Sequence, residues 1–365
     1  MDPKDLKTKL AREFATAKGI DGILLLNTGF KDANFVYLTD FRGGLYEDSF
    51  LFVERAGVTL FTDMREYEGA LKERIQGMRI VELDSKKKVE VLINKVKGKR
   101  IGINGSFIPY LKYRDINKKW KPKALVDVTE SLEKARCVKE RYELERISKA
   151  NSITKKAILV TQKNLKVGMT EKEAARFFDD LIMKLGADGN SFESIVCFGR
   201  NAAIPHHSPD NTRLKYGDFV LIDVGVKVRN YCSDVTRTII FGNDRKRIKD
   251  YGKKARVIEV VAAAQKKAMA AIRAGANGGK VHMIVQDYID SADGGAYKGT
   301  FGHSLGHSIG VEVHDGSGRF LGPSSNLILK ESMVSSVEPG IYIPGFGGAR
   351  IEDDIVVTKN GCKIL

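Results

Sequence analysis

Three of the six histidines in this 365-residue chain lie in one stretch of thirteen residues, HSLGHSIGVEVHD, from His303 to Asp315. Imidazole nitrogens are frequent ligands of divalent metal ions, so the cluster suggests a metal site. A histidine cluster alone is weak evidence, because such a site would also need carboxylates from elsewhere in the chain.

Two aspartates lie on the segment 217–242, whose sequence predicts two strands that turn at Arg229-Asn230. If those two residues form the turn, Asp223 lies opposite Thr236, and Asp234 lies on the same face of the hairpin. The two aspartates are then diagonal neighbours with backbone positions about 7–8 Å apart. At that spacing, both carboxylates can converge on one or two cations.

Two explanations fit this aspartate pair. A carboxylate in the apolar strand FVLIDVGV is costly to bury without a partner, which favours metal binding, with Gly225 leaving room for the ions. Alternatively, Thr236 and Arg237 could satisfy both carboxylates within the protein. We prefer the metal interpretation, because other acidic residues could join the site.

Two such glutamates lie in the C-terminal part of the chain. Glu338 precedes a Pro-Gly turn in SMVSSVEPGIYIPG, and Glu352 lies in the apolar segment ARIEDDIVV. Either could be an ordinary glutamate at a sheet edge, and Arg350 could form a salt bridge with Glu352. Oxygen-rich ligation with a single nitrogen nevertheless suits a pair of ions such as Mn, Fe, Co or Zn. The candidate ligand set is Asp223, Asp234, His307, Glu338 and Glu352.

The elements that must position these residues fall into two domains, as the chain length favours. Residues 1–130 show alternating helical and strand patterns and contain no histidine, which predicts an α/β domain without chemistry of its own. Its predicted elements include a helix from Pro3 to Lys18, the strand GILLLN, and a hairpin, SFLFVERAGVTLFTD, that turns at Ala56-Gly57.

Residues 131–365 follow an α+β pattern, and we place the domain boundary near Ser131. Apolar residues at three- and four-residue spacing predict one long amphipathic helix from Cys137 to Leu165. Further helices are predicted at 171–185 and 252–273, and strands at 193–198, 218–241, 308–314 and 333–358.

The composition limits the partners of the protein. A net charge of +15 would suit nucleic acid, but basic runs such as DRKRIKDYGKK lack interleaved aromatic residues and predict solvated surface. The four cysteines form no CxxC pair, which argues against a disulfide framework or a cysteine-built zinc site. The chain begins with a charged, helix-like segment and contains no apolar run of membrane-spanning length. We therefore expect a cytoplasmic protein with no nucleic-acid or membrane partner.

Several segments resemble the metallopeptidase family with the pita-bread fold, which includes methionine aminopeptidase, aminopeptidase P and Xaa-Pro dipeptidase (prolidase). HSLGHSIGVEVHD is similar to the signature of the proline-specific branch. The resemblance covers residues 131–365, and residues 1–130 resemble, more loosely, the N-terminal domain of creatinase-like members. Other segments similar to family blocks are SFESIVCFGRNAAIPHHSP, GDFVLIDVG, YCSDVTRT, SVEPGIYIPG and RIEDD.

The resemblance implies a role for each candidate residue. Asp223 would chelate one ion, and Asp234 and Glu352 would bridge two ions. His307 and Glu338 would complete the other ion. A hydroxide activated by both ions would attack the substrate while Glu338 moves protons. The candidates for contacting the substrate or steadying the oxyanion are His206, His303, His314, Arg319 and Arg350.

Arg319 bears on the choice of substrate. It lies in the loop HDGSGRF, five positions after His314. A guanidinium suits bidentate contact with a carboxylate, and a dipeptidase must recognise the free carboxylate one residue beyond the scissile bond. An ordinary exposed loop arginine is an equally good interpretation.

The resemblance therefore predicts a dinuclear metal hydrolase that cleaves the bond before proline in Xaa-Pro dipeptides. We expect Mn²⁺ or Co²⁺, with Zn²⁺ or Fe²⁺ as alternatives, and a homodimer that acts on small peptides. The nearest alternative is an aminopeptidase P, which acts on longer X-Pro peptides with the same ligands. A non-catalytic pita-bread protein that binds histones or RNA, or a creatinase-like C–N hydrolase, fits less well because all five ligands are present.

Overall fold

The computed structural model describes residues 9–10, 14, 19–28, 31–316 and 320–365. Contacts within the chain divide it into two units, Met1–Arg136 and Cys137–Leu365. The boundary that the sequence predicts near Ser131 lies inside helix α6 (Thr129–Cys137). The predicted helix from Pro3 to Lys18 lies largely outside the described residues. Within the described ranges, no helix is both long and apolar enough to cross a membrane.

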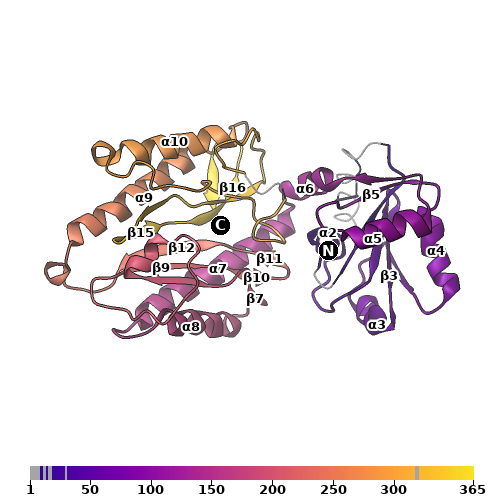
Figure 1. Ribbon diagram of the computed structural model, residues 1–365, viewed down its shortest axis with the longest axis horizontal. Coiled ribbons are helices and arrows are strands. Elements are labelled where there is room, and N and C mark those ends of the chain that lie inside the picture. Colours follow the sequence, from indigo (N-terminus) through magenta and orange to yellow (C-terminus); the bar gives the residue numbers. More distant parts are fainter. Residues whose placement is uncertain (1–8, 11–13, 15–18, 29–30, 317–319) are drawn as a thin grey trace. The chain divides into compact units, whose positions relative to one another are not determined.

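The first unit is built on one six-stranded mixed sheet with the strand order β4-β3-β2-β1-β5-β6 (Figure 1). This arrangement confirms the predicted α/β class. The predicted hairpin is present, but Glu54 pairs with Gly57, so its two-residue turn lies one position earlier, at Arg55-Ala56. The strands are β1 (Gly22–Leu26), β2 (Phe50–Glu54), β3 (Gly57–Thr62), β4 (Met78–Glu82), β5 (Arg100–Ile103) and β6 (Ala124–Asp127), and the accompanying helices are α2 (Ala33–Thr39), α3 (Met64–Glu73), α4 (Lys86–Val96) and α5 (Tyr110–Asp115).

The second unit places short antiparallel strands between two pairs of helices, α7 with α8 on one side and α9 with α10 on the other (Figure 1). One apolar core packs beneath each pair. The helices are α7 (Arg141–Asn164), α8 (Glu171–Lys184), α9 (Tyr251–Ala271) and α10 (Gly278–Ser291), and the strands are β7 (Gly189–Asn190), β8 (Ile195–Phe198), β9 (Phe219–Val224), β10 (Val226–Val228), β11 (Tyr231–Cys232), β12 (Val235–Ile240), β13 (Val334–Val337), β14 (Gly340–Ile343), β15 (Gly347–Arg350), β16 (Asp353–Val357) and β17 (Cys362–Ile364).

The single long helix predicted from Cys137 to Leu165 is wrong at its start. Helix α6 ends at Cys137, and α7 begins only at Arg141, where Glu140 and Glu143 form a capping box. Between the two helices, the buried Lys139 ammonium forms an ion pair of 2.7 Å with Asp315. These contacts hold the residues between the helices in an extended conformation that amphipathic periodicity cannot reveal.

The aspartate hairpin has the predicted register. Arg229 and Asn230 have φ of 47° and 71°, as a two-residue type I′ turn requires, and Asp223 pairs with Thr236. Antiparallel pairing continues from β9 and β12 through β10 and β11 to the turn. The predicted relation between Asp223 and Asp234 therefore holds.

Gly225 has a different role from the predicted one. A Cβ atom at this position would lie 1.9 Å from the carbonyl oxygen of Ser233 and 2.2 Å from the hydroxyl of Ser191. The glycine therefore admits the neighbouring backbone, rather than leaving room for ions. This close approach separates β9 from β10.

The structure also differs from the predicted elements elsewhere in the second unit. Residues 308–314 form no strand and make only an isolated bridge, from Ser308 to Ser335. Helix α10 and the short strand β17 were not predicted. None of the four cysteines, all of which lie within the described residues, forms a disulfide bond, and those in β8 and β11, Cys197 and Cys232, are fully buried.

Candidate active site

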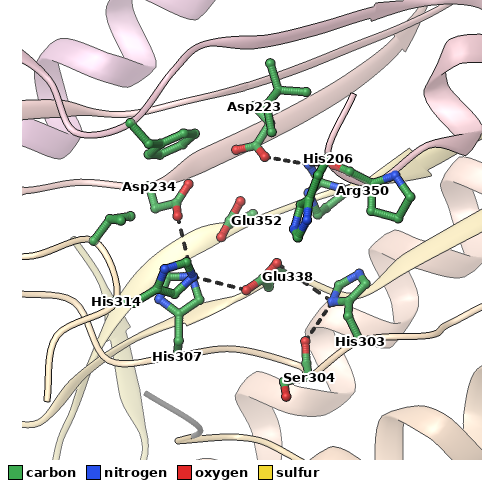
Figure 2. A pocket seen from close by; sticks show the side chains of 14 residues that line it. His206, Asp223, Asp234, His303, Ser304, His307, His314, Glu338, Arg350 and Glu352 are labelled. Carbon is green, nitrogen blue, oxygen red and sulfur yellow. Dashed lines mark hydrogen bonds and ion pairs between the residues drawn. The ribbon is translucent and has the colours of Figure 1, made fainter. Parts of the chain in front are cut away.

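A cavity of about 420 Å³ in the second unit brings together nine of the ten residues that the sequence proposes (Figure 2). The tenth, Arg319, lies outside the described residues. Phe192, Ile195, Pro205, Ser304 and Val313 also line the cavity and were not predicted. The nine are His206, Asp223, Asp234, His303, His307, His314, Glu338, Arg350 and Glu352.

The carboxylates stand on or beside strands of two different sheets. Asp223 lies in β9, and Asp234 directly precedes β12. Glu338 directly follows β13, and Glu352 directly precedes β16. The backbone N–H of Glu352 donates to the carbonyl of Thr236 at 3.1 Å, which joins the two sheets at the site.

The histidine stretch lies along β13 without forming a strand of its own. The backbone N–H groups of Ser336 and Glu338 donate to carbonyls of this stretch. Ser336 donates to the carbonyl of His307 at 2.9 Å, and Glu338 donates to that of Leu305 at 2.8 Å. The Ser336 hydroxyl accepts from the His307 N–H at 3.0 Å and donates to the Glu338 carboxylate at 3.1 Å. Ser336 therefore fixes two candidate ligands at once.

The acidic side chains lie close enough to repel one another. Burial, and next the neighbouring Glu352, raise the pKa of Asp234 well above its ordinary value. Burial and Glu338 do the same to Glu352, and burial raises the pKa of Glu338 to about 8. His307 Nε2 lies 3.5 Å from Asp234 and 3.4 Å from Glu338 (Figure 2). A positive charge at this point would relieve the repulsion.

Three buried carboxylate oxygens at the site have no hydrogen-bond partner among the described residues. They are Oδ1 of Asp223, Oδ1 of Asp234 and Oε1 of Glu352. Leaving a buried acceptor unsatisfied is costly, so three such oxygens in one cavity fit a site for cations. Ligand atoms of Asp234, His307 and Glu352 also lie within 4.8 Å of one another. Oxygen donors with one imidazole fit divalent cations.

Burial favours the neutral form of His303, His307 and His314, which is the form in which an imidazole binds a metal. Burial lowers the pKa of His303 to about 4, and burial with the neighbouring His314 lowers that of His307 to about 3. Burial lowers the pKa of His314 as well. The rings of His307 and His314 lie 4.1 Å apart between centroids. Both rings therefore cannot be protonated at once without repelling each other.

A chain of hydrogen bonds that the sequence did not predict crosses the site through Tyr342. Arg350 donates to the Tyr342 hydroxyl at 2.6 Å, and this hydroxyl lies 2.9 Å from His303 Nε2. His303 Nδ1 lies 2.8 Å from the carbonyl of Ser304 and so must donate to it. Tyr342 then donates to His303, and both ring nitrogens of His303 have partners within the protein.

Arg350 makes contacts within the protein that bear on its predicted role with substrate. Its guanidinium donates to Asp223 at 2.5 Å, to Thr236 at 3.1 Å and to the carbonyl of Pro205 at 3.4 Å. It lines the cavity, but these contacts support a role in holding Asp223. Binding of substrate by Arg350 and His303 stays a prediction.

The alternative explanations of the acidic residues are not observed. Thr236 donates to Glu352 at 2.6 Å, rather than satisfying the aspartate pair. Arg237 bonds Asp353 at 2.7 Å, and the ion pair of Arg350 is with Asp223 rather than Glu352. Asp223, Asp234 and Glu352 therefore each keep one oxygen without a hydrogen-bond partner among the described residues.

Each of the two units is similar to a known protein family. Residues 145–359 match the model of metallopeptidase family M24, and residues 7–138 match the creatinase/prolidase N-terminal domain. The chain belongs to metallopeptidase family M24. This result confirms the resemblance and the two-domain fold predicted from the sequence.

Relatives of this M24 protein cover its full length. An Xaa-Pro dipeptidase of Pyrococcus horikoshii is 32% identical over 100% of this chain and 98% of its own. The crystal structure of the prolidase from Pyrococcus horikoshii OT3 has a TM-score of 0.86 at 31% identity, covering 98% of this chain and 97% of that chain. An X-Pro aminopeptidase from Thermotoga maritima has a TM-score of 0.84 at 31% identity, covering 95% of both chains.

Proposed function

We propose that this M24 protein is a metal-dependent dipeptidase that hydrolyses the bond before proline in Xaa-Pro substrates. The observation that carries the proposal is the cavity in which four carboxylates and His307 converge, with three buried carboxylate oxygens left unpartnered among the described residues. Full-length similarity to proteins named Xaa-Pro dipeptidase supports the substrate class. These similarities do not favour the non-catalytic binding protein or the creatinase-like hydrolase.

The ligand set fits two divalent cations. Asp223 and Asp234 would hold one ion from the hairpin, His307 and Glu338 would hold the other, and Glu352 would lie between them with Asp234. When bound, such ions polarise the peptide carbonyl and supply a nucleophile at neutral pH. Mn²⁺ or Co²⁺, with Zn²⁺ or Fe²⁺ as alternatives, belongs to the same proposal, as do a homodimer and a cytoplasmic location.

The side chains of this chain would perform the remaining steps. Glu338 lines the cavity and can accept a proton from the attacking water and release it to the leaving proline nitrogen. His206 and His314 line the cavity and can donate ring N–H groups to the developing oxyanion. The apolar side chains of Phe192, Ile195 and Val313 line the same cavity and would exclude bulk water.

Two measurements test this proposal. Chelation should abolish hydrolysis of Ala-Pro, and Mn²⁺ or Co²⁺ should restore it, because the ions supply the nucleophile. Full activity in a sample shown to contain no metal would refute the metal-dependent mechanism.

An aminopeptidase that acts on longer X-Pro peptides is the second candidate, favoured by the similarity to the Thermotoga maritima X-Pro aminopeptidase. Comparing Ala-Pro with a longer X-Pro peptide separates the two. Arg319→Ala should weaken dipeptide use by about 1.5–3 kcal/mol, the usual value of a charged hydrogen bond, and leave the longer peptide unaffected. Equal effects on both lengths, or none on either, would remove Arg319 as the carboxylate anchor and leave the aminopeptidase alternative open.

A further inference from the structure

A second buried carboxylate, outside the cavity, collects its hydrogen bonds from a single segment. Glu171 is the first residue of α8 and is fully buried. Its Oε1 accepts from the backbone N–H of Phe198 at 2.7 Å and from the amide of Asn201 at 2.9 Å. Its Oε2 accepts from His207 Nε2 at 2.7 Å and from the backbone N–H of Asp210 at 3.0 Å. All four donors lie between residues 198 and 210.

This group has the residue types of a metal site, but its carboxylate oxygens already accept hydrogen bonds. Ligand atoms of Glu171, His207 and Asp210 lie within 4.8 Å of one another. Both oxygens of Glu171, however, already accept two hydrogen bonds each, and the Asp210 carboxylate accepts from the Thr212 N–H at 2.6 Å. Since a carboxylate only accepts, His207 must carry its proton on Nε2. The network is satisfied by hydrogen bonds alone.

The anchored segment carries His206 into the candidate active site. Pro205 and His206 line the cavity between the anchors at Asn201 and His207, and Figure 2 shows the His206 ring beside Arg350. Within the described residues, the His206 imidazole makes no hydrogen bond to the protein. Its direction in the cavity therefore depends on how the backbone on either side is held.

The adjoining backbone is fastened to the same helix end. The N–H groups of Glu171 and Lys172 donate to the carbonyls of Thr212 and Asp210, both at 3.2 Å. These are among the first N–H groups of α8, which have no partner inside the helix. The start of α8 thus holds the segment by main chain and side chain together.

We propose that Glu171 and His207 are positioning residues that fix His206 for catalysis, an inference that rests on the proposed peptidase function. His207 acts as the link, because its ring ties the residue next to His206 directly to the buried carboxylate. Among the described residues, neither side chain makes a hydrogen bond or ion pair with the ligand set. The effect of the pair on the reaction must therefore pass through the segment it holds, which carries His206 and also Pro205, whose carbonyl accepts from Arg350 at 3.4 Å. The His206→Ala background separates these two routes.

A double-mutant cycle on the full-length, metal-loaded protein tests this coupling. Glu171→Gln replaces an acceptor by an amide that cannot accept all four hydrogen bonds. On Ala-Pro, it should lower kcat by at least about tenfold in the wild-type background, since small misplacements of catalytic groups are costly. In the His206→Ala background, the same change should lower kcat less than about twofold, because the coupled group is gone. Equal losses in both backgrounds would overturn the proposal.

Two substitutions of His207 give an independent test if Glu171→Gln does not fold. His207→Gln retains an N–H donor for Glu171 and should keep more of kcat than His207→Ala, with KM little changed in both. Equal kcat in these two variants would count against the link. In ¹³C-histidine NMR spectra, the His206 signal should move in His207→Ala and not in His207→Gln.

Two controls keep this inference separate from the proposed function. Wild-type protein without activity on Ala-Pro or a longer X-Pro peptide would refute the proposed function, and the NMR comparison would still test whether His207 holds His206. Metal content should equal that of wild type in every variant of the cycle. A variant that loses metal along with kcat would show that the network supports the metal site instead, and would overturn the assignment to His206.

Discussion

At the scale of single residues, the candidate ligands divide their oxygens between the protein and the cavity. Asp223 accepts from Arg350 through Oδ2 and leaves Oδ1 unpartnered, and Glu352 accepts from Thr236 through Oε2 and leaves Oε1 unpartnered, within the described part of the chain. The hydrogen bond to one oxygen fixes the orientation of each carboxylate, so the direction of its second oxygen is fixed before an ion binds. Mutation of outer partners of this kind typically costs about 10–100-fold in metal affinity or activity.

Asp234 tests the ligand assignment. Asp234→Asn should bind fewer than two ions per chain, because an amide cannot replace a bridging carboxylate. His206→Ala is the matched control, since it alters the same cavity without removing a ligand, and it should keep its metal. Metal content is measured by plasma mass spectrometry. Full occupancy and wild-type activity in Asp234→Asn would show that the hairpin aspartates do not converge on ions.

Glu338 tests the proton-transfer role. Glu338→Gln keeps the shape of the side chain and removes the base, so kcat on Ala-Pro should fall by about 10²–10⁴-fold. Steady-state kinetics separates kcat from KM, and a metal assay on the same sample shows whether ion loss contributes. A change in KM alone would contradict the assignment.

At the scale of elements, the hairpin depends on Gly225, a residue that metal binding by itself does not require. In Gly225→Ala, the new methyl group would lie 1.9 Å from the Ser233 carbonyl, so the two strands must separate beside both aspartates. We expect a lower midpoint of thermal unfolding and weaker metal binding. Gly252→Ala in α9 is the control, because a Cβ there meets nothing within 4 Å. Similar unfolding midpoints in both variants would contradict this view of the hairpin.

Local patterns were sufficient for the hairpin and for helices α8 and α9, whose turn residues and periodicity are encoded nearby in the sequence. They failed where distant contacts decide. Helix α10 starts with two glycines, which argue against a helix, yet a Cβ at Gly278 would lie 2.1 Å from the Phe320 carbonyl. The break before α7 likewise depends on Lys139 meeting Asp315, which is far away in the sequence.

The site was predictable as a set of residue types and less so as a network. Carboxylates in apolar strands stand out in one sequence, whereas Tyr342 looked like an ordinary strand residue. The only sign in the local sequence that Tyr342 belongs to the site was its spacing from Glu338. Gly340 and Tyr342 follow Glu338 at every second position. The network through Arg350 and His303 required the strands to be placed in space.

At the scale of the whole molecule, the described residues that line the cavity all belong to the Cys137–Leu365 unit. Stability of that unit should therefore be linked to metal binding. Ions that bind the folded chain and not the unfolded chain stabilise the fold by mass action.

This linkage predicts an unusual pH dependence for the metal-free protein. Burial raises the pKa of Glu338 to about 8, and raises those of Asp234 and Glu352 as well, whereas the unfolded chain ionises near its ordinary values of about 4. These protonated groups make their full contribution to the free energy of unfolding below about pH 4, and this contribution is lost as pH rises toward about 8. After chelation, the midpoint temperature of thermal unfolding should be lower at about pH 8.5 than at about pH 5.

Two further samples check that the carboxylates of the site cause this fall. Glu338→Gln removes one of the titrating groups and should make the fall smaller. Added Mn²⁺ should raise the midpoint most at the higher pH, where the carboxylates are ionised. A midpoint that does not depend on metal at either pH would contradict the linkage.

The burial of Cys197 and Cys232 has a practical consequence for such measurements. Both thiols lie in strands next to the acidic residues, and both are inaccessible to solvent. Oxidants and alkylating agents reach exposed thiolates first, so these two positions are protected by the fold. These two thiols therefore need no dithiothreitol during metal titrations, and its own sulfur atoms would compete for the ions and distort the measured affinity; the half-buried Cys362 is the thiol to replace first.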